Sequence, residues 1–263
     1  MLDPIQSLWV GGRLSTLEQL SVASFLRHGH PYHLYAYGEV EGVPEGAEVR
    51  DAREVLPEDR IFTYQAGTTG RGSYSGFANL WRLHLLHDRG GWWADTDVVC
   101  TRPWTGFPDE VVATSPEGKW GEPANNCVLR LPAGSPLAAY CIEQHDRFDL
   151  ATLKMAQNGP HLLQEAVREV GTDGLVAADV FCPYGWQIAQ FATWPRWRTA
   201  WHNAKRTLRR DGMPRFEPFP PDGHAVHLWT NMWKQNGLDK DAAYPPSSLY
   251  ERLKRRYLTG PPG

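Results

Sequence analysis

Two aspartates separated by one residue, Asp95 and Asp97, are the first candidates for chemistry in this sequence. In an extended backbone, alternate side chains point the same way and their Cα atoms lie roughly 7 Å apart, so both carboxylates can close on one divalent cation. Hard cations such as Mg²⁺ and Mn²⁺ favour carboxylate oxygens, and Mg²⁺ commonly completes its shell with water and substrate phosphates. The spacing therefore indicates a metal that bridges the protein to a diphosphate.

A second Asp-x-Asp, Asp239-Lys240-Asp241, provides an internal control. It follows Gly237 in a polar stretch, where a solvated turn or a helix start is expected. Asp95 and Asp97 instead follow an apolar helical segment and Gly90-Gly91, a pair that lets the backbone approach a ligand closely. They also precede an apolar strand, beside which unpaired carboxylates are costly. The context favours a functional role for the first pair, with a surface turn as the alternative.

Composition narrows the class of protein. The chain has 263 residues, 41% of them hydrophobic and 12% aromatic, which is enough for one sizeable core. Its net charge of −3 argues against a surface built entirely for nucleic acid. No apolar run approaches the ~20 residues of a membrane span, and a strand-like segment begins close to the N-terminus. We therefore expect no signal peptide and a cytoplasmic location.

The cysteines are far apart in the sequence and include no Cys-x-x-Cys. This spacing predicts neither a zinc site nor a disulfide framework, and reduced, packed thiols are expected. The four cysteines are Cys100, Cys127, Cys141 and Cys182.

The N-terminal elements predict a βαβ unit. Residues 5–10 are typical of a strand that ends before Gly11, and residues 32–37 alternate as a second strand. Between them, Ser15 and Glu18 have the spacing of a capping box, which predicts the start of a helix. Such a unit implies a parallel sheet that binds ligands at the carboxyl ends of its strands.

A helix that begins at Ser73 is expected before the aspartates. Its broad apolar stripe predicts burial between the sheet and neighbouring helices. Asn79 and Arg82, three residues apart, share another face, which points either into a cleft or into solvent. The Gly-rich residues 67–72 just before it predict a mobile loop, and they lack the Gly-Lys-Ser/Thr ending of a phosphate-binding P-loop.

The rest of the chain continues the α/β pattern without an internal repeat, so we predict one domain. Further strands are expected at 110–114, 126–130 and 225–229, and further helices at 136–148, 160–167 and 247–257.

Several landmarks together resemble the glycosyltransferases with a DxD sugar-binding region. Residues 78–82 (Ala-Asn-Leu-Trp-Arg) are similar to their Ser-Asp-x-x-Arg helix, and residues 90–97 to their Gly-Gly-x-Tyr-x-Asp-x-Asp pattern. Residues 8–12 look like their first strand, Gly159-Pro160 like their helix entry, and residues 227–233 like their C-terminal His and Trp element. The group includes α-1,4-galactosyltransferase-like enzymes, initiating mannosyltransferases and, more distantly, the large clostridial glucosylating toxins. The resemblance covers nearly the whole chain.

Two departures from this pattern stand out. Asn79 occupies the position of the usual Asp, and Met232 that of the usual Ser before the Trp. Asn keeps an acceptor oxygen and adds a donor while it removes the charge, so a hydrogen bond to a sugar hydroxyl can survive. The departure leaves the identity of the donor sugar open.

The resemblance implies a GT-A-type, Rossmann-like single domain with a mostly parallel sheet flanked by helices. Residues 1–100 would form the nucleotide-binding half and residues 101–263 the acceptor half, with a UDP-sugar as donor and Mn²⁺ or Mg²⁺ as cofactor. Asp97 would ligate the metal directly and Asp95 would bridge metal and ribose. His227 would complete the protein ligands, with a hydrogen-bonded strand histidine as the alternative.

The resemblance also implies contacts to the donor. Arg82 would neutralise the diphosphate or meet the sugar, and Asn79 would contact the sugar. Trp9, with Gly11 beside it, would stack on uracil, and Trp233 would close over the phosphates on a flexible C-terminal loop. A surface ion pair for the arginine and plain packing for the tryptophans are the alternatives.

The implied reaction is retaining transfer of a sugar to a glycan or glycolipid acceptor, in surface polysaccharide or lipopolysaccharide synthesis. Breaking the anomeric bond builds negative charge on the β-phosphate, which a preorganised cation stabilises. No residue is assigned to the face opposite the leaving group, where Asn125, Asn126 and Gln187 are candidates by polarity alone. A phosphohydrolase or nuclease that uses the same carboxylates and a non-catalytic carbohydrate- or membrane-binding relative are the alternative functions.

Basic residues gather between positions 196 and 215, interleaved with tryptophans and opposed by one acid, Asp211. A solvated basic face is one interpretation. The other is docking on an anionic membrane or acidic glycan, which would place the protein peripherally on the inner face of the membrane. Nucleic acid is the less favoured partner. The basic residues are Arg196, Arg198, Lys205, Arg206, Arg209, Arg210 and Arg215.

Overall fold

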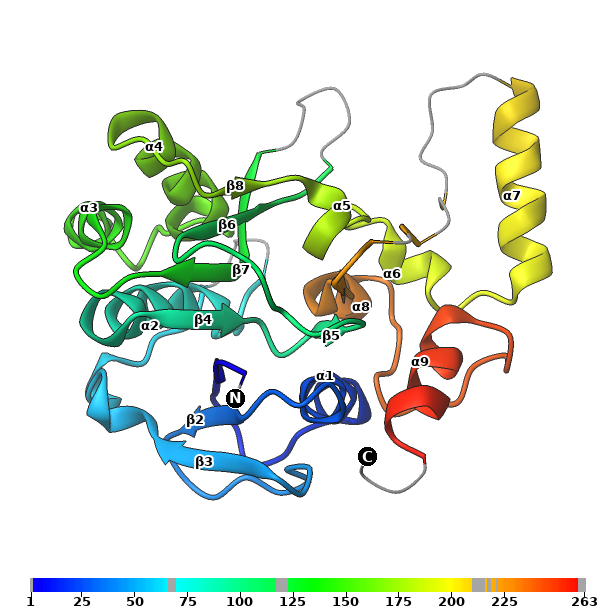
Figure 1. Ribbon diagram of the computed structural model, residues 1–263, viewed down its shortest axis with the longest axis horizontal. Helices are drawn as coiled ribbons and strands as arrows, with labels where there is room; N and C mark the ends of the chain where they lie inside the picture. The colour runs from blue at the N-terminus through cyan, green and yellow to red at the C-terminus, as the bar shows by residue number, and fades with distance from the viewer. Residues whose placement is uncertain are drawn as a thin grey trace.

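The computed structural model describes residues 2–65, 70–116, 123–209, 216, 219–220 and 222–259. It contains both strands and helices, with runs of either kind, such as β4 to β7, between stretches in which they alternate (Figure 1). The strands are β1 (Ile5–Trp9), β2 (Tyr32–Ala36), β3 (Ala47–Asp51), β4 (Gly91–Ala94), β5 (Val98–Cys100), β6 (Val111–Thr114), β7 (Ala124–Leu131), β8 (Leu175–Val176) and β9 (Ala225–His227). The helices are α1 (Thr16–Arg27), α2 (Ser75–Arg89), α3 (Pro136–His145), α4 (Leu162–Glu169), α5 (Ala178–Phe181), α6 (Ile188–Phe191), α7 (Arg196–Arg209), α8 (Thr230–Gln235) and α9 (Leu249–Tyr257).

A seven-stranded sheet in the order β3-β2-β1-β4-β7-β6-β8 forms the centre of the molecule. Strands β3, β2, β1 and β4 run parallel to one another, as does the β6 and β8 pair. Only β7 opposes its sheet neighbours, β4 and β6. The predicted α/β fold with a mostly parallel sheet flanked by helices is confirmed.

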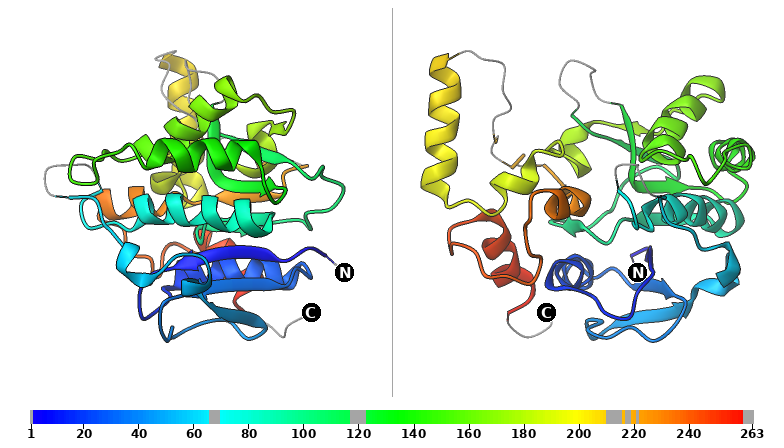
Figure 2. Two further views of the ribbon diagram at one scale, coloured as in Figure 1. Left: turned by 90° about the vertical axis from the view of Figure 1, so that its left-hand side faces the viewer. Right: turned by 180° about the vertical axis from the view of Figure 1, so that it is seen from behind.

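The two faces of this sheet are covered by different helices (Figure 2). Successive side chains on a strand point to opposite faces, and the adjacent tryptophans of β4 follow this rule. Trp93 joins the core formed with α2, α3 and α4, where its ring centroid lies 6.0 Å from that of Trp81. Trp92 joins the core on the α1 and α5 side, beside Trp104. The C-terminal end of β4, just before Asp95, is thereby packed on both faces of the sheet.

The start of α1 confirms the predicted capping box. The Ser15 side chain accepts a hydrogen bond from the helix backbone, and the Glu18 carboxylate accepts one from the backbone N–H of Ser15. The second Asp-x-Asp reinforces this helix start, because Oδ1 of Asp241 accepts hydrogen bonds from both N and Oγ1 of Thr16, each at 2.7 Å. The second Asp-x-Asp therefore has a structural role, because its Asp241 connects the C-terminal region to the start of α1.

Some elements differ from the sequence-based expectation. Helix α2 begins at Ser75, two residues later than predicted, and strand β3 and helix α7 were not anticipated. The strand predicted at 225–229 ends at His227. Of the Gly-rich segment 67–72, residues 67–69 lie outside the described residues, as do Arg210 and Arg215. Within the described ranges, every helix is too short or too polar to cross a lipid bilayer.

Candidate functional site

A small antiparallel sheet brings Asp97 and His227 together. Strand β5 begins directly after Asp97, and β9 ends at His227, with Val98 paired to His227 in the register. The ladder extends by one more bond, since the backbone N–H of Leu228 donates to the carbonyl of Asp97 at 2.9 Å. The sheet therefore fixes the distance between two predicted metal ligands that are far apart in sequence.

Both oxygens of the Asp97 carboxylate have polar partners. Its Oδ1 lies 3.2 Å from Nε2 of His227, and its Oδ2 accepts from N and Oγ1 of Thr230 at 2.8 and 2.9 Å. Burial alone would raise the pKa of Asp97, but the charge and hydrogen bonds of these partners hold that pKa below its ordinary value. Burial would likewise lower the pKa of His227, yet pairing with Asp97 raises it well above its ordinary value. The two groups form a buried ion pair.

Asp95 is held in place by Trp93 and Arg82. Its Oδ1 accepts from Nε1 of Trp93 at 2.8 Å and lies 2.7 Å from a guanidinium nitrogen of Arg82. The guanidinium carbon of Arg82 also lies 4.6 Å from the centroid of the Trp93 ring. One carboxylate oxygen of Asp95 thus has fixed partners, while the side chain remains 26% exposed and can meet a ligand.

A network of asparagine side chains holds the Arg82 guanidinium in place. The guanidinium donates to Oδ1 of Asn79 at 3.0 Å and to the carbonyl of Asn126. Asn79 Oδ1 also accepts from the Asn126 amide at 2.8 Å, and its own amide nitrogen donates to Asn158 at 3.3 Å. A Cβ at Gly159 would lie 2.5 Å from that nitrogen, so only glycine leaves room for it. Asn79 therefore positions the arginine, and its predicted contact to the sugar stays a prediction.

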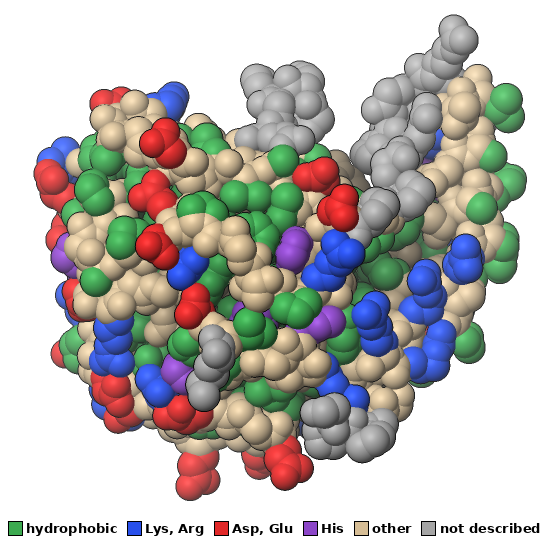
Figure 3. All heavy atoms as spheres, viewed as in Figure 1, with side chains coloured by type: hydrophobic (Ala, Val, Ile, Leu, Met, Phe, Trp, Pro, Cys, Tyr) green, Lys and Arg blue, Asp and Glu red, His purple; other side chains and the backbone are tan. Residues whose placement is uncertain are grey.

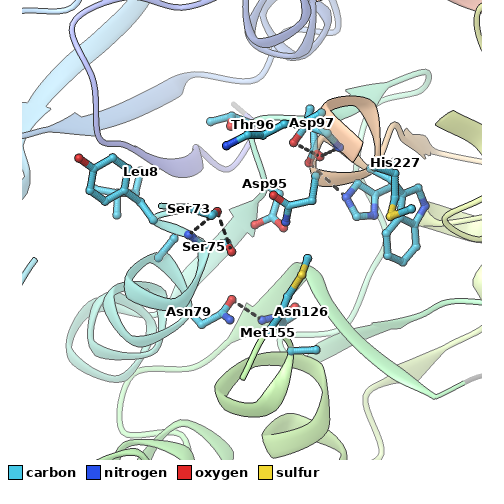
Figure 4. Close-up of a pocket in the computed structure, with 18 of the residues that line it drawn as sticks. Leu8, Ser73, Ser75, Asn79, Asp95, Thr96, Asp97, Asn126, Met155 and His227 are labelled. Carbon is cyan, nitrogen blue, oxygen red and sulfur yellow. Dashed lines mark hydrogen bonds and ion pairs between the residues drawn. The ribbon is translucent and has the colours of Figure 1, made fainter. Parts of the chain in front are cut away.

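These groups line a cleft of about 670 Å³. Figure 4 shows Asp95, Asp97 and His227 around one side of it, with the hydrogen-bonded Asn79 and Asn126 on the other. Of the predicted residues, the cleft is lined by Trp9, Asn79, Arg82, Asp95, Asp97 and His227.

Gly11 and Trp233 do not line the cleft. Gly11 lies beside Trp9, where an added Cβ would be 3.2 Å from the indole nitrogen, so its small size serves the tryptophan. Trp233 is 0% exposed, donates to the carbonyl of Leu228 at 2.9 Å and packs 4.9 Å from the ring of Tyr250. Trp233 therefore lies in the core of this structure, and its expected closure over a ligand stays a prediction.

Trp229 is the cleft-lining tryptophan of that segment, and it was not predicted. Its ring stacks on the His227 imidazole with centroids 4.3 Å apart, and its indole donates to the carbonyl of Tyr184 at 3.0 Å. Its backbone is left-handed, at φ 56° and ψ 58°, which is costly for a large side chain and marks a position held by its surroundings. The strand-like pattern through residue 229 concealed this turn.

The candidates for the face opposite the leaving group separate into two sets. Asn125 and Asn126 line the cleft, whereas Gln187 does not. The Asn125 amide donates to Ser115 and its oxygen accepts from the backbone of Cys127, so both of its ends have protein partners.

Two donor sets share His227. In the first, the ligand atoms of Asp95, Asp97 and His227 lie within 4.8 Å of one another, a combination of carboxylate and imidazole that fits Mn²⁺ or Mg²⁺. In the second, Cys127, Cys182 and His227 lie equally close, with Sγ of Cys182 3.7 Å from Nδ1 of the imidazole. The four cysteines are buried and free, as expected, but their wide spacing gave no sign of this thiol and imidazole cluster.

Comparisons with known proteins show that this chain is similar in fold to some solved structures. No protein-family model and no curated protein matches the chain. It is similar to the PaToxG glycosyltransferase, with 12% identity and a TM-score of 0.45 over 97% of this chain and 84% of that one. It is also similar to the apo-form glycosyltransferase GlyE of Streptococcus pneumoniae TIGR4, with 11% identity and a TM-score of 0.46, over 91% of this chain and 61% of that one. Function therefore has to follow from the residues of the cleft.

Proposed function

We propose that this chain is a metal-dependent, retaining glycosyltransferase. It would move a sugar from a nucleotide diphosphate sugar, with UDP as the expected nucleotide, to a glycan or glycolipid acceptor in surface polysaccharide or lipopolysaccharide synthesis. One observation carries the proposal: residues from β1, α2, the β4–β5 connection and β9 that the sequence resemblance singles out converge on one cleft. The converging residues are Trp9, Asn79, Arg82, Asp95, Asp97 and His227.

The donor set suits the charge that such a reaction develops. A divalent cation held by Asp95, Asp97 and His227 would stabilise the negative charge that builds on the diphosphate as the anomeric bond breaks. The protein contributes preorganisation, because the Asp97 carboxylate is fixed by Thr230 and the Asp95 carboxylate by Arg82. A ligand therefore meets carboxylates that do not have to reorient.

The cleft supports a nucleotide-sized donor. Its volume of about 670 Å³ is in the range of small-molecule sites. Trp9 lies at the carboxyl end of β1, the position at which parallel sheets bind ligands, and offers a ring for base stacking. The Arg82 side chain is 4% exposed, so we assign it mainly to holding Asp95 in place. Its positive charge would also help to stabilise the negative charge of the diphosphate.

The acids of the cleft favour transfer over phosphate hydrolysis. Among the described lining residues the acids are Glu18, Asp95 and Asp97. Glu18 is committed to Lys240 and to the cap at Ser15, which leaves one pair of carboxylates. A two-metal hydrolase or nuclease typically draws on more acids than one pair.

The test is ligand-dependent stabilisation. UDP-sugars should raise the melting temperature of the wild-type protein when Mn²⁺ is present and not in a chelator. Asp97→Asn should abolish this shift, whereas Asp239→Asn, in the exposed second Asp-x-Asp, should preserve it. Melting in chelator alone shows that each variant is folded. A shift that survives in Asp97→Asn would refute the proposed metal site.

Turnover separates the enzyme from a binding protein. Slow hydrolysis of the UDP-sugar that depends on Mn²⁺ and on Asp97 supports transferase chemistry, and NMR of the first-formed sugar anomer reports retention. Binding without turnover for any acceptor would favour the non-catalytic alternative, and faster release of nucleotides from DNA would favour the nuclease.

A further inference from the structure

Helix α7 stands at the outer edge of the molecule (Figures 1 and 2). One side of it is anchored: the His202 ring packs 4.9 Å from that of Phe191, and the Asn203 side chain donates to the carbonyl of Phe216 at 2.7 Å and accepts from its backbone nitrogen at 3.0 Å. These contacts fix which face of the helix turns away from the protein.

The outward face is apolar. Trp197 is 71% exposed, Trp201 61% and Leu208 84%. At about 100° per residue these positions fall within roughly 40° of one another, so they form one stripe, and Ala204 lies about 20° beyond its edge. Figure 3 shows hydrophobic side chains along the outer edge of α7. Three large apolar side chains on one free helix face are more than the scattered single exposures of an ordinary surface.

Cations flank this stripe. Helix α7 carries five basic residues and no acid, although the whole chain has a net charge of −3. Arg198 and Lys205 fall roughly 60–80° from the centre of the stripe. Their side chains lie against aromatic rings, Arg198 over Trp194 at 4.0 Å and Lys205 over Trp201 at 4.8 Å. An apolar face with a basic flank is the arrangement of helices that lie in a membrane interface.

We propose that α7 docks this protein on an anionic lipid surface, with Trp197, Trp201 and Leu208 inserted at the headgroup level and Arg198 and Lys205 contacting lipid phosphates. The anionic partner follows from charge complementarity, because the helix offers cations alone. A second copy docked through the same face would bring two basic helices together. Nucleic acid would use the cations and stack on the tryptophans, but it would leave Leu208, the most exposed of the three, without a partner.

Docking through α7 would also place the cleft near the lipid. Helix α6 leads into α7 and packs against α8, and residues of α8 such as Asn231 and Met232 line the cleft. A lipid-linked acceptor would then be presented to the cleft by the same surface that holds the protein. The docking itself requires neither metal nor donor, so it stands or falls independently of the proposed reaction.

Vesicle flotation with the full-length chain, without metal or nucleotide sugar, tests the proposal. Wild-type protein should float with vesicles of 30% phosphatidylglycerol in phosphatidylcholine and should bind pure phosphatidylcholine at least about tenfold more weakly. The triple variant Trp197→Ser, Trp201→Ser, Leu208→Ser should lose at least about tenfold in binding. The matched control Leu150→Ser, Val170→Ser, which changes exposed apolar residues elsewhere, should bind as the wild type does.

Three results would overturn the proposal. The first is equal flotation of the triple variant and the wild type, with circular dichroism showing both folded. The second is a dimer by light scattering that the triple variant abolishes while vesicles bind neither protein. The third is binding of a DNA or RNA oligonucleotide through α7 more tightly than the anionic vesicles.

A second pair of substitutions tests the cations of the helix. Arg198→Ser with Lys205→Ser should reduce the preference for anionic vesicles, and an unchanged preference would also contradict the assignment.

Discussion

Asp97 and His227 form a buried ion pair, with 3.2 Å between Oδ1 of the carboxylate and Nε2 of the imidazole. The other imidazole nitrogen faces Cys182 at 3.7 Å. One histidine thus connects the carboxylates of the cleft to a cluster of thiols behind it. A proton on His227, whose pKa is raised by Asp97, supplies a positive charge beside the buried carboxylate.

The ion pair predicts a pH dependence of stability in chelator. The raised pKa of His227 stabilises the fold fully below the ordinary value of 6.5, and this contribution is lost as the pH rises through the raised pKa. The lowered pKa of Asp97 contributes above the ordinary value of 3.8 and is lost as the pH falls through the lowered pKa. The stability difference between wild type and His227→Gln should therefore be largest, roughly 1–3 kcal/mol, between about pH 4 and 6.5. Urea denaturation across pH 4 to 9 measures it, and a difference that does not vary with pH would contradict the assignment.

The sequence predicted the fold where local signals agree with burial. The capping box at Ser15 and Glu18 located α1 correctly because both partners belong to one turn. Strand β3 was missed because it is a sheet edge with exposed side chains, including Val49 at 47%, and so lacks alternation. Helix α7 could not be recognised from the sequence because its apolar stripe faces outward and basic residues are spread along the rest of the helix.

The sequence also predicted most of the cleft but not the contacts within it. Resemblance identified Asp95, Asp97 and His227 as neighbours, and the β5 and β9 pairing brings them together. It did not reveal that Asn158 completes the amide network, because a single polar residue in a polar segment carries no local signal. The buried position of the Trp233 ring could not be predicted, because a motif fixes only the residue type. The direction of the side chain depends on where β9 ends and α8 begins.

Metal selectivity distinguishes the two donor sets that share His227. If Mn²⁺ is held by the carboxylate set, Cys182→Ser should keep the Mn²⁺-dependent rise in melting temperature, because hard cations prefer oxygen and imidazole ligands over thiolates. Asp97→Asn should lose it. Differential scanning fluorimetry with a titration of Mn²⁺ checks this, and Zn²⁺ serves as the thiophilic comparison. Loss of the Mn²⁺ response in Cys182→Ser alone would show that the thiol set holds the metal.

Arg82 should be far less tolerant of substitution than its helix neighbour Arg89. A lysine at position 82 keeps the charge but cannot donate to Asp95, Asn79 and the Asn126 carbonyl together, so Arg82→Lys should lower the free energy of unfolding by roughly 1–3 kcal/mol. It should also weaken metal-dependent donor binding. Arg89→Lys is the matched control, since that arginine also donates to several acceptors, Glu54 and the Tyr35 hydroxyl, but is 37% exposed. Water can replace these bonds, so its effect should stay below about 1 kcal/mol. Equal effects in chemical denaturation would argue against the positioning role.

Asn79→Asp introduces the acid of the sequence pattern that this chain resembles, yet it should destabilise this protein. The Asn79 amide nitrogen donates to Oδ1 of Asn158, and a carboxylate there would oppose two oxygens at 3.3 Å. Asn158 cannot reverse its amide without loss, because its own nitrogen donates to Gly76 and its oxygen accepts from Tyr64. We expect a decrease of about 1–3 kcal/mol in unfolding free energy, partly offset by a stronger pairing with Arg82.

The matched control for this change is Asn236→Asp, whose amide nitrogen also donates to an oxygen, the Met232 carbonyl at 2.7 Å, but at an exposed position. Water can replace that bond, so the change should lower stability by less than about 1 kcal/mol. Donor profiling by thermal shift should show the same ranking of nucleotide sugars for Asn79→Asp and wild type, because the amide faces Arg82, Asn126 and Asn158 rather than the sugar. A changed ranking with unchanged stability would return Asn79 to the direct sugar contact that the sequence first suggested.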